Sequence, residues 1–248
     1  MMHIRKILHG ICYLWHKPII VFCFHKVSDV FDSLYGGIDD WTETEQFKHN
    51  IYNLQKKYTF ISIEEAYKHL LHDKFRFRSY AVLTSDDGYQ CILDILPWLE
   101  KEKIPITLFL STQYLNGQSY DPWFDAHWKG LSIEEKIEVV KNMYIQKQHL
   151  PTIDLISDNV SLSIHGYGHE EVSTMDAETF GAYVKKCREI LEAHPRYKAF
   201  YAYTWGRHSD ITDRVLCENG IVPVYCDGKE NVLWDGIIHR ICIDGKLL

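Results

Sequence analysis

Apolar and polar positions alternate along the chain in a way that predicts strands followed by helices. Residues 18–25 (PIIVFCFH) form a short continuous apolar run, which is typical of a buried strand. Residues 44–58 instead repeat apolar side chains at helical spacing, at Phe47, Ile51 and Leu54. Further strands are predicted at residues 60–63, 80–87, 106–112, 160–165, 199–205, 222–226 and 237–244.

Polar capping residues mark where helices begin between these strands. Ser62 with Glu65, and Ser132 with Glu135, each form an S-x-x-E capping box, in which the two side chains satisfy backbone N–H groups of the first turn. Asp176 can cap a long amphipathic helix in the same way. The strands are therefore separated by helices along most of the chain.

About seven such alternations predict a parallel sheet covered by helices. This number of units favours a closed or nearly closed barrel over an open doubly wound sheet. We predict the α/β class, with a distorted (β/α)7-type barrel as a single domain over residues 18–248 and an N-terminal extension over residues 1–17.

Composition narrows the functional classes. The chain has 248 residues, of which 46% are apolar and 25% charged, as in an ordinary soluble globule. Its net charge is −7, and without a basic block it is a poor candidate for binding nucleic acid. No G-x-G-x-x-G or P-loop motif follows a strand, which removes the main support for a nucleotide site.

The cysteines and the N-terminus bear on location. The seven cysteines are odd in number and form no C-x-x-C, which indicates free thiols and a cytoplasmic location. Residues 1–17 begin with basic residues and an apolar stretch that His9 and Gly10 interrupt. No run reaches the roughly 18 apolar residues of a membrane span. A signal peptide and a membrane-surface helix stay open as alternatives, the latter implying weak peripheral membrane association through this segment.

Parallel α/β folds carry their chemistry at the carboxyl ends of strands, and three predicted strands end in polar residues. Asp86 and Asp87 end one strand, in the sequence TSDDG. His165 ends a second and is followed by GYGH, which brings His169 four residues later. The third ends in TWGR, and His25, at the end of the first strand, is a weaker candidate.

These pieces together predict a divalent metal site. Adjacent carboxylates repel each other unless a cation or hydrogen-bond donors neutralise one of them. Asp86 and Asp87 point in different directions, because side chains alternate along a strand, so one can bind an ion while the other stays free as a base. His165 and His169 can converge on the same ion, and two imidazoles with one carboxylate leave coordination positions open, as in catalytic zinc sites. A solvated D-D-G turn and two surface histidines are the structural alternatives.

The ordered motifs resemble those of the polysaccharide deacetylases (carbohydrate esterase family four, the NodB-homology domain). Residues 82–112 resemble the first motif region, whose usual form is T-F-D-D-G. HGYGH keeps the spacing of the second motif, H-[ST]-x-x-H, and YAYTWGR resembles the third, F-A-Y-P-[YW]-G. VFCFHKV and HRICID resemble the family's opening and closing strands, so the resemblance runs from about residue 18 to residue 244.

The resemblance implies a metal-dependent hydrolase that removes an N-acetyl group from an amino sugar. Carried over by position, Asp86 is the catalytic base, and Asp87, His165 and His169 bind the metal. We expect one divalent ion, with Zn²⁺ as the first choice and Co²⁺, Ni²⁺ or Mn²⁺ as alternatives. The metal would polarise the amide carbonyl and acidify a water, whose proton Asp86 would accept. The metal and backbone N–H groups around Trp205 would stabilise the oxyanion.

Three residues are predicted to bind substrate: Tyr203, Trp205 and Arg240. Trp205 could wall a pocket for the acetyl methyl group. Arg240 could instead pair with Asp86, because many family members carry an Arg that orients the base at the position of Ala202.

The general acid has two candidates. Many members supply it from a C-terminal L-x-H motif, and the C-terminal histidine here is His239. Alternation puts His239 and Arg240 on opposite faces of their strand, so only one can point inward. We therefore predict His25 as the acid. Ser85 and Thr204 stand where the family has Phe and Pro. A diverged or slow enzyme therefore remains an alternative hypothesis.

Three functions follow from these observations. The first is N-deacetylation of an oligo- or polysaccharide or of an intermediate in cell-surface glycan assembly. The second is a saccharide-binding module without turnover, and the third is a hydrolase of a non-sugar amide. The aromatic segment 119–130 (SYDPWFDAHWKG) would suit stacking on a sugar ring, and equally a cover over the barrel.

Overall fold

The fold is seen in a computed structural model that describes residues 15–31, 41–117, 130–156 and 158–245. The strands are β1 (Ile19–Phe24), β2 (Lys26–Val27), β3 (Trp41–Thr42), β4 (Thr59–Phe60), β5 (Tyr80–Ser85), β6 (Ile106–Leu110), β7 (Val160–Ile164), β8 (Tyr197–Ala202), β9 (Val222–Tyr225) and β10 (Ile238–Cys242). The α-helices are α2 (Thr44–Gln55), α3 (Ile63–His72), α4 (Ile92–Lys101), α6 (Ile133–Met143), α7 (Leu150–Ile156), α8 (Ala177–Leu191) and α9 (Asp210–Glu218). Short 3-10 helices are η3 (Thr112–Asn116), η4 (Lys147–His149) and η5 (Thr204–Gly206).

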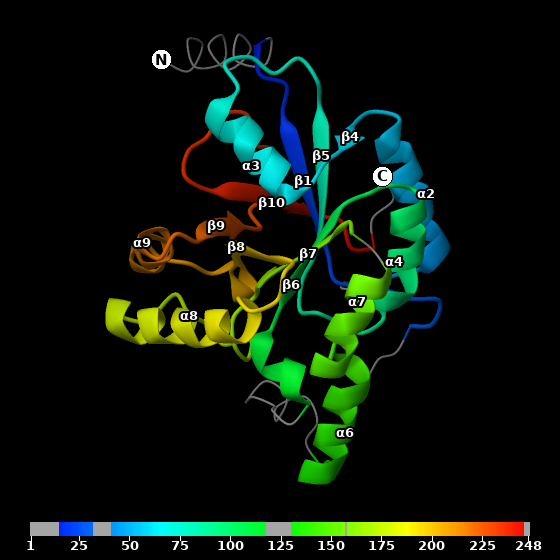
Figure 1. Cartoon of the computed structure of the whole chain (residues 1–248), viewed down its shortest axis with the longest axis vertical. Coiled ribbons are helices and arrows are strands. Elements are labelled where there is room, and N and C mark those ends of the chain that lie inside the picture. The colour runs from blue at the N-terminus through cyan, green and yellow to red at the C-terminus, as the bar shows by residue number, and fades with distance from the viewer. Residues whose placement is uncertain (1–14, 32–40, 118–129, 157, 246–248) are drawn as a thin grey trace.

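Seven parallel strands close into a barrel, which confirms the predicted distorted (β/α)7 fold (Figure 1). Neighbours run in the order β1-β10-β9-β8-β7-β6-β5, and β5 pairs with β1 over its whole length. The short β4 extends the edge of β5 that β6 occupies further along. The register shifts between Leu162 and Ile164 where β7 meets β8, which is one source of the distortion.

Period-two alternation sends one set of side chains into the barrel and the other toward the helices. The inner set includes apolar residues from several strands, among them Val21, Val82, Phe109, Ala202 and Val224. The outer set packs under the helices in a larger apolar cluster. Residues that continue the same alternation past the end of a strand, two or four positions after an inward-pointing residue (the inner parity), therefore point into the mouth of the barrel.

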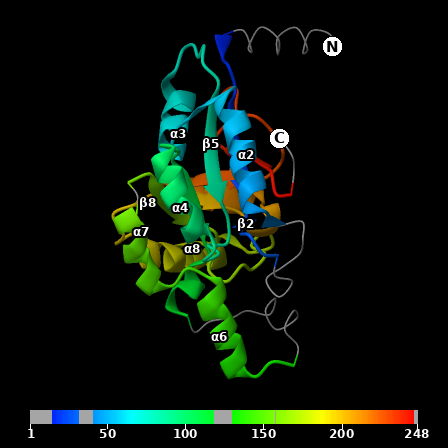
Figure 2. The ribbon, with the colours of Figure 1, turned by 90° about the vertical axis from the view of Figure 1, so that its right-hand side faces the viewer.

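The helices lie around the strands, and α3 stands beside β5 (Figure 2). Its apolar residues Ile63, Ala66 and Leu70 pack in one cluster with the inner residues, so α3 covers the end of the barrel where the strands begin. Tyr67 of α3 contacts the ring of Phe200 on β8, with 5.9 Å between the ring centroids. Glu64 accepts from Ser161 at the start of β7 and pairs with Lys198 of β8 at 2.8 Å. The opposite end, where the strands finish, is left for the site.

Several predicted helix starts are confirmed. Both capping boxes are present, at the starts of α3 and α6, and Asp176 caps α8 by accepting from the backbone N–H of Thr179 at 2.8 Å. The strand predicted at 199–205 was placed too far along, because it runs from Tyr197 to Ala202 and then turns into η5. Trp205 has a φ of 59°, which no strand residue adopts.

Residues 1–14 and most of the aromatic segment 119–130 lie outside the described residues. Among those described, no helix has both the length and the apolar character needed to span a membrane.

Candidate metal and catalytic site

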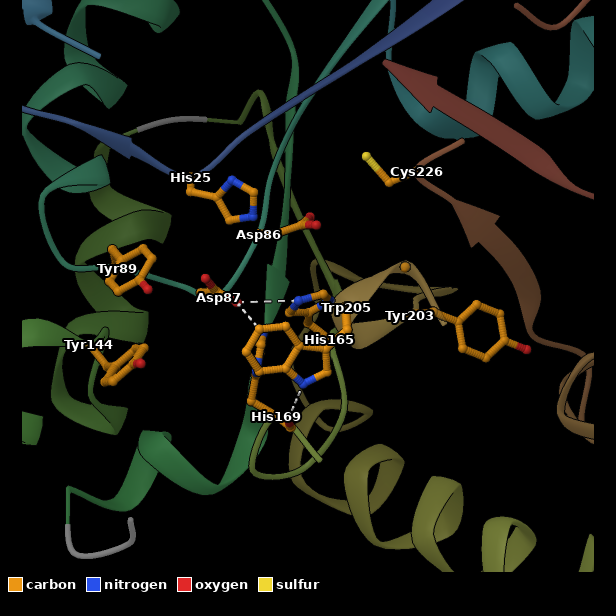
Figure 3. A pocket seen from close by; sticks show the side chains of 11 residues that line it. His25, Asp86, Asp87, Tyr89, Tyr144, His165, His169, Tyr203, Trp205 and Cys226 are labelled. Atoms are coloured by element: carbon orange, nitrogen blue, oxygen red, sulfur yellow. Dashed lines mark hydrogen bonds and ion pairs between the residues drawn. The ribbon is translucent and has the colours of Figure 1, made fainter. Parts of the chain in front are cut away.

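A pocket of about 280 Å³ opens where the barrel strands end (Figure 3). It is lined by His25, Asp86, Asp87, Tyr89, Tyr144, His165, His169, Tyr203, Trp205, Gly206 and Cys226. These residues come from the ends of five barrel strands and from the loops that follow them. Segments far apart in the sequence therefore converge, as the parallel topology requires.

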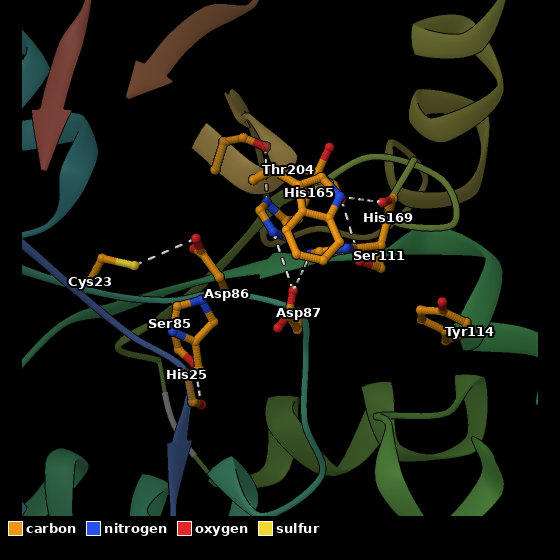
Figure 4. A network of polar contacts seen from close by, with 12 residues as sticks. Cys23, His25, Ser85, Asp86, Asp87, Ser111, Tyr114, His165, His169 and Thr204 are labelled. Carbon is orange, nitrogen blue, oxygen red and sulfur yellow. Dashed lines mark hydrogen bonds and ion pairs between the residues drawn. The ribbon is translucent and has the colours of Figure 1, made fainter. Parts of the chain in front are cut away.

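Asp87, His165 and His169 come together at the base of this pocket. Asp87 Oδ1 lies 3.2 Å from His165 Nε2 and 3.2 Å from His169 Nε2 (Figure 4). The three ligand atoms all lie within 4.8 Å of one another. Two ligands bound at about 2.0–2.1 Å to one tetrahedral ion are separated by about 3.3 Å, so the spacing fits a single small cation.

The hydrogen bonding of the triad also fits a cation. Asp87 Oδ1 is buried and accepts no hydrogen bond, which is costly for a carboxylate oxygen unless a cation neutralises it. His165 Nδ1 lies 2.9 Å from the carbonyl oxygen of Ala202. If that nitrogen carries the proton, it donates to the carbonyl, and the lone pair of Nε2 faces Asp87.

The charge environment keeps Asp87 ionised. Burial alone would raise the pKa of Asp87, but His169 and His165 hold it well below its usual range. A carboxylate that stays ionised between two imidazoles is a ready hard donor, and the donor set of two nitrogens and one oxygen matches catalytic zinc sites.

Backbone strain is concentrated at the site. In the described residues, four positions other than glycine have positive φ, and three of them belong to the pocket: Asp87 (67°), His169 (67°) and Trp205 (59°). Such conformations cost roughly 1–3 kcal/mol each and persist where the surrounding structure enforces them. Strict strand alternation would turn Asp87 away from the pocket that Asp86 lines. The left-handed backbone at Asp87 breaks that alternation, and both carboxylates line the same pocket.

Asp86 is held by a buried arginine. Arg240 is fully buried, and its NH1 and NH2 donate to the two carboxylate oxygens of Asp86 at 2.6 and 2.8 Å. Cys23 Sγ lies 3.4 Å from Asp86 Oδ2 (Figure 4). Burial alone would raise the pKa of Asp86, but the charges of Arg240 and His165 lower it to about 2. Asp86 is therefore ionised and fixed in orientation at neutral pH.

His25 also lines the pocket and has a carboxylate partner of its own, Asp244. Its Nδ1 lies 2.6 Å from Asp244 Oδ2, and its backbone N–H donates to Asp244 Oδ1 at 2.9 Å. Burial alone would lower the pKa of His25, but the hydrogen bond to Asp244 raises it well above its ordinary value. At neutral pH the ring is protonated and lines the pocket.

His239 is positioned differently. Its two ring nitrogens lie 2.9 Å from Asp227 and 3.0 Å from Asp235, and the residue does not line the pocket. Arg240 points into the barrel while His239 points out, as the alternation requires. Of the two histidines considered as acid, His25 alone lies in the pocket.

Sequence comparison assigns the family. A sequence model described as Polysaccharide deacetylase matches residues 76–224, which is more than half of the chain. The chain belongs to the polysaccharide deacetylase family. The family acts on acetylated carbohydrate, which supports carbohydrate deacetylation as the chemistry of the pocket. The search of curated proteins found no match.

Solved structures share the fold. The chain is similar to the deacetylase PplD of Streptococcus pyogenes (15% identity, TM-score 0.70, 92% of this chain and 93% of that one). It is also similar to IcaB from Ammonifex degensii (17% identity, TM-score 0.72, 92% of each chain). A de-N-acetylase from Aggregatibacter actinomycetemcomitans gives 12% identity and a TM-score of 0.71, with 91% of this chain and 94% of that one covered. At these identities the likeness establishes the barrel fold.

One predicted role needs correction. Arg240 is predicted from the sequence either to bind substrate or to pair with Asp86. It is fully buried and does not line the pocket, and its guanidinium donates to Asp86, so the second role is the one that the structure has. The resemblance puts an arginine that orients the base at the position of Ala202, on β8. Here the guanidinium that holds Asp86 comes from Arg240, on β10.

The replacements within the family motifs are accommodated. Ser85 is buried, and its hydroxyl donates to the carbonyl of His25 at 3.3 Å. The hydroxyl of Thr204 donates to the carbonyl of Glu170. A Cβ at Gly166, where the family has Ser or Thr, would lie 2.8 Å from the hydroxyl oxygen of Tyr183, so that ring occupies the space. None of these positions leaves a buried hydroxyl without a partner.

The two aromatic residues of the third motif are placed differently. Trp205 is 51% exposed, and its ring centroid lies 4.7 Å from that of His169, at the rim of the pocket. Tyr203 lines the pocket but directs its hydroxyl away, where it donates to Asp213 at 2.8 Å (Figure 3). Trp205 is thus the better placed of the two to touch a bound molecule.

Sequence reasoning missed several residues of the site. Asp244 could have been found, because it continues the inner parity of Arg240 on the last strand. Cys226 follows β9 in the same way. Tyr89 and Tyr144 stack with ring centroids 5.2 Å apart to form one wall. Tyr144 ends a helix far from any motif, and no sequence signal indicates it.

Proposed function

We propose that this protein is a metal-dependent N-deacetylase that releases acetate from an N-acetylated amino sugar in an oligo- or polysaccharide or in a glycan-assembly intermediate. The single observation that carries the proposal is Asp87 Oδ1. It is buried, lacks a hydrogen-bond donor, and lies 3.2 Å from two imidazole nitrogens. Beside it stands a second carboxylate that Arg240 already holds.

In this proposal Asp87, His165 and His169 would hold one divalent ion, with Zn²⁺ as the first choice. The ion, when bound, would polarise the amide carbonyl and acidify a water. The chain's own residues would then supply proton transfer and orientation.

Asp86 accepts the proton of the attacking water. With a pKa of about 2 it is a weak base, so it depends on a strongly acidified water. Arg240 fixes both oxygens of Asp86 and thereby limits its motion. The thiol of Cys23 stands at Oδ2 as a further contact.

His25 donates a proton to the leaving amine nitrogen. Asp244 holds Nδ1, so Nε2 is the ring nitrogen left to face the substrate, and the raised pKa keeps its proton in place at neutral pH. Trp205 and the stacked pair of Tyr89 and Tyr144 offer apolar faces to the sugar. The backbone N–H groups around Trp205 remain our predicted donors to the oxyanion.

The test compares Asp86→Asn with Asp87→Asn. Acetate release is measured on N-acetylglucosamine oligomers and on small non-sugar amides, and bound metal is measured by mass spectrometry. Asp86→Asn should retain the metal and lose at least about 100-fold in kcat, whereas Asp87→Asn should lose both. Normal turnover by Asp86→Asn, or full metal content in Asp87→Asn, would refute the assignments.

The substrate panel separates the remaining alternatives. Acetate from the sugar oligomers alone supports the proposed substrate class. Turnover of small amides alone would make the protein a non-sugar amidohydrolase. Tight oligomer binding by the metal-loaded protein without acetate release would make it a binding module.

The six described cysteines are all free thiols, which supports our prediction of a cytoplasmic location.

A further inference from the structure

Three exposed aromatic rings form a cluster at the end of the barrel where the strands begin. Trp15 is 49% exposed, Phe75 56% and Phe77 66%. The ring centroid of Trp15 lies 5.3 Å from that of Phe75 and 6.4 Å from that of Phe77, and the two Phe rings are 6.2 Å apart. We call these three residues the aromatic cluster. Their contact makes one apolar surface rather than three scattered side chains.

The backbone fixes the cluster in place. Arg76 N–H donates to the carbonyl of Trp15, and the N–H of Lys17 donates to the carbonyl of Arg76, both at 2.7 Å. The side chain of Arg76 is buried, and its guanidinium donates to the carbonyls of Lys17 at 2.6 Å and Val232 at 2.7 Å. With Arg76 pointing inward, Phe75 and Phe77 must point outward. The exposed positions of the three rings are therefore fixed by the backbone hydrogen bonds and by the buried Arg76 side chain, and not by contacts of the rings themselves.

Positively charged residues flank the rings along the chain. Lys17, Lys74 and Arg78 are exposed and flank the aromatic residues along the chain. The nearest carboxylate in that sequence, Asp73, is paired with His69 at 2.8 Å. Residues 1–14, which lead directly into Trp15, add two basic residues and no acidic one. This local excess stands out in a chain whose net charge is −7.

We propose that the aromatic cluster and its flanking cations dock on an anionic lipid membrane surface. Aromatic rings settle at the level of lipid headgroups, and exposed Lys and Arg are attracted to anionic lipids. The cores of protein–protein interfaces are depleted of charged residues, whereas here the exposed Lys74 and Arg78 adjoin the two Phe residues along the chain and Lys17 follows two residues after Trp15. An anionic membrane satisfies both features at once.

The position of the cluster orients a docked molecule. β1 alone separates Trp15 from His25, and its six residues span about 20 Å. The start of β1 and the loop between α3 and β5 lie at the top of Figure 1, while the strands end toward its centre. A molecule docked by this face would turn its pocket away from the lipid. This orientation favours a substrate glycan that extends into water, rather than a sugar that lies among the headgroups. This step rests on the proposed function.

The experiment is co-sedimentation of the full chain with two kinds of vesicle. One contains phosphatidylcholine alone, and the other mixes phosphatidylcholine with phosphatidylglycerol. The wild type should bind the anionic vesicles. Lys74→Glu with Arg78→Glu should weaken that binding at least about 30-fold. Phe75→Ser with Phe77→Ser should weaken it about tenfold or more.

A matched control changes two exposed lysines elsewhere. Lys147→Glu with Lys185→Glu makes the same change in net charge on η4 and α8 and should bind as the wild type does. Circular dichroism checks that each variant is folded. Metal content should not change in any of them, which separates this test from that of the catalytic proposal.

Three results would overturn the proposal. The first is a wild type that fails to sediment with anionic vesicles. The second is equal binding by all variants, which would place the membrane contact in residues 1–14 instead. The third is a lipid-free dimer that Phe75→Ser with Phe77→Ser dissociates, which would make the face a self-association surface.

Discussion

Replacing Arg240 with methionine tests the electrostatic core of the site. Methionine approximates the length of the arginine stem but removes the guanidinium that donates to both oxygens of Asp86. Arg240 is fully buried and Asp86 is 3% exposed, so water cannot readily replace the lost partner. The variant leaves an uncompensated buried carboxylate.

The magnitude follows from the pKa of Asp86. Its value of about 2, against 3.8 for an unperturbed Asp, corresponds to roughly 2–3 kcal/mol of stabilisation at neutral pH. Removing one partner of a buried ion pair costs about 3–5 kcal/mol, because burial then acts alone on the remaining charge. We expect Arg240→Met to lower the free energy of unfolding by that larger amount at pH 7.

The pH dependence has a definite sign. In the wild type the pKa of Asp86 is depressed, so its stabilisation is complete above about pH 4 and is lost as the pH falls toward 2. In the variant, burial without the guanidinium raises the pKa of Asp86 above its unfolded value. The stability gap between the two proteins should therefore narrow as the pH falls from 7 through the raised pKa, because a protonated Asp86 tolerates burial.

The assay is urea denaturation of both metal-free proteins across this pH range, with Arg76→Met as the matched control. Arg76 is also buried, but its guanidinium donates to backbone carbonyls. Its loss should cost stability by an amount that depends much less on pH. Adding Asp86→Asn to Arg240→Met should recover stability, since the amide carries no charge.

Two results would refute this reasoning. A loss below about 1 kcal/mol at pH 7 would show that the buried pair contributes little. A gap that stays constant with pH, as in the Arg76 control, would show that packing rather than charge explains the effect.

Other substitutions test the rest of the site. Asp244→Asn should remove the support that raises the pKa of His25, so the alkaline limb of kcat/KM should move to lower pH by about one pH unit or more; an unmoved limb would exclude His25 as the acid. Gly168→Ala would bring a Cβ within 2.4 Å of Gln113 Nε2 and should weaken metal binding about tenfold in a chelator competition, with rescue by Gln113→Ala; failure of Gln113→Ala to rescue would show that this contact does not explain the effect. Trp205→Ala should raise KM for the oligomer more than it lowers kcat; the reverse split would place the ring in the transition state.

Much of the fold could be predicted because buried parallel strands leave strong sequence signals. The apolar run at 18–25 contains β1, while the DDG and HGYGH motifs each follow the end of a strand, and parallel topology brings those strand ends together. The convergence of Asp87, His165 and His169 within 4.8 Å follows from that topology. Spacing within one motif then sets the local geometry.

What could not be predicted depends on neighbours across the barrel. Two roles for Arg240 stay open in the sequence, and only the position of β10 beside β1 decides that its guanidinium binds Asp86. Tyr144 reaches the pocket by stacking on Tyr89, a contact between residues that no local pattern links. The left-handed backbone at Asp87 also escapes a pattern-based reading, because strand alternation assumes extended φ values.

Each of the two proposed proton-transfer groups, Asp86 and His25, has a partner of opposite charge. These partners lower the pKa of Asp86 and raise the pKa of His25. Arg240 holds Asp86 ionised, while Asp244 holds His25 protonated. In the proposed mechanism, Asp86 is thus ionised and ready to accept a proton, while His25 is favoured in its protonated form, as the first step of amide hydrolysis requires. In the proposed mechanism Asp86 needs a buried guanidinium on the inner face of the barrel, and in this chain β10 supplies it through Arg240.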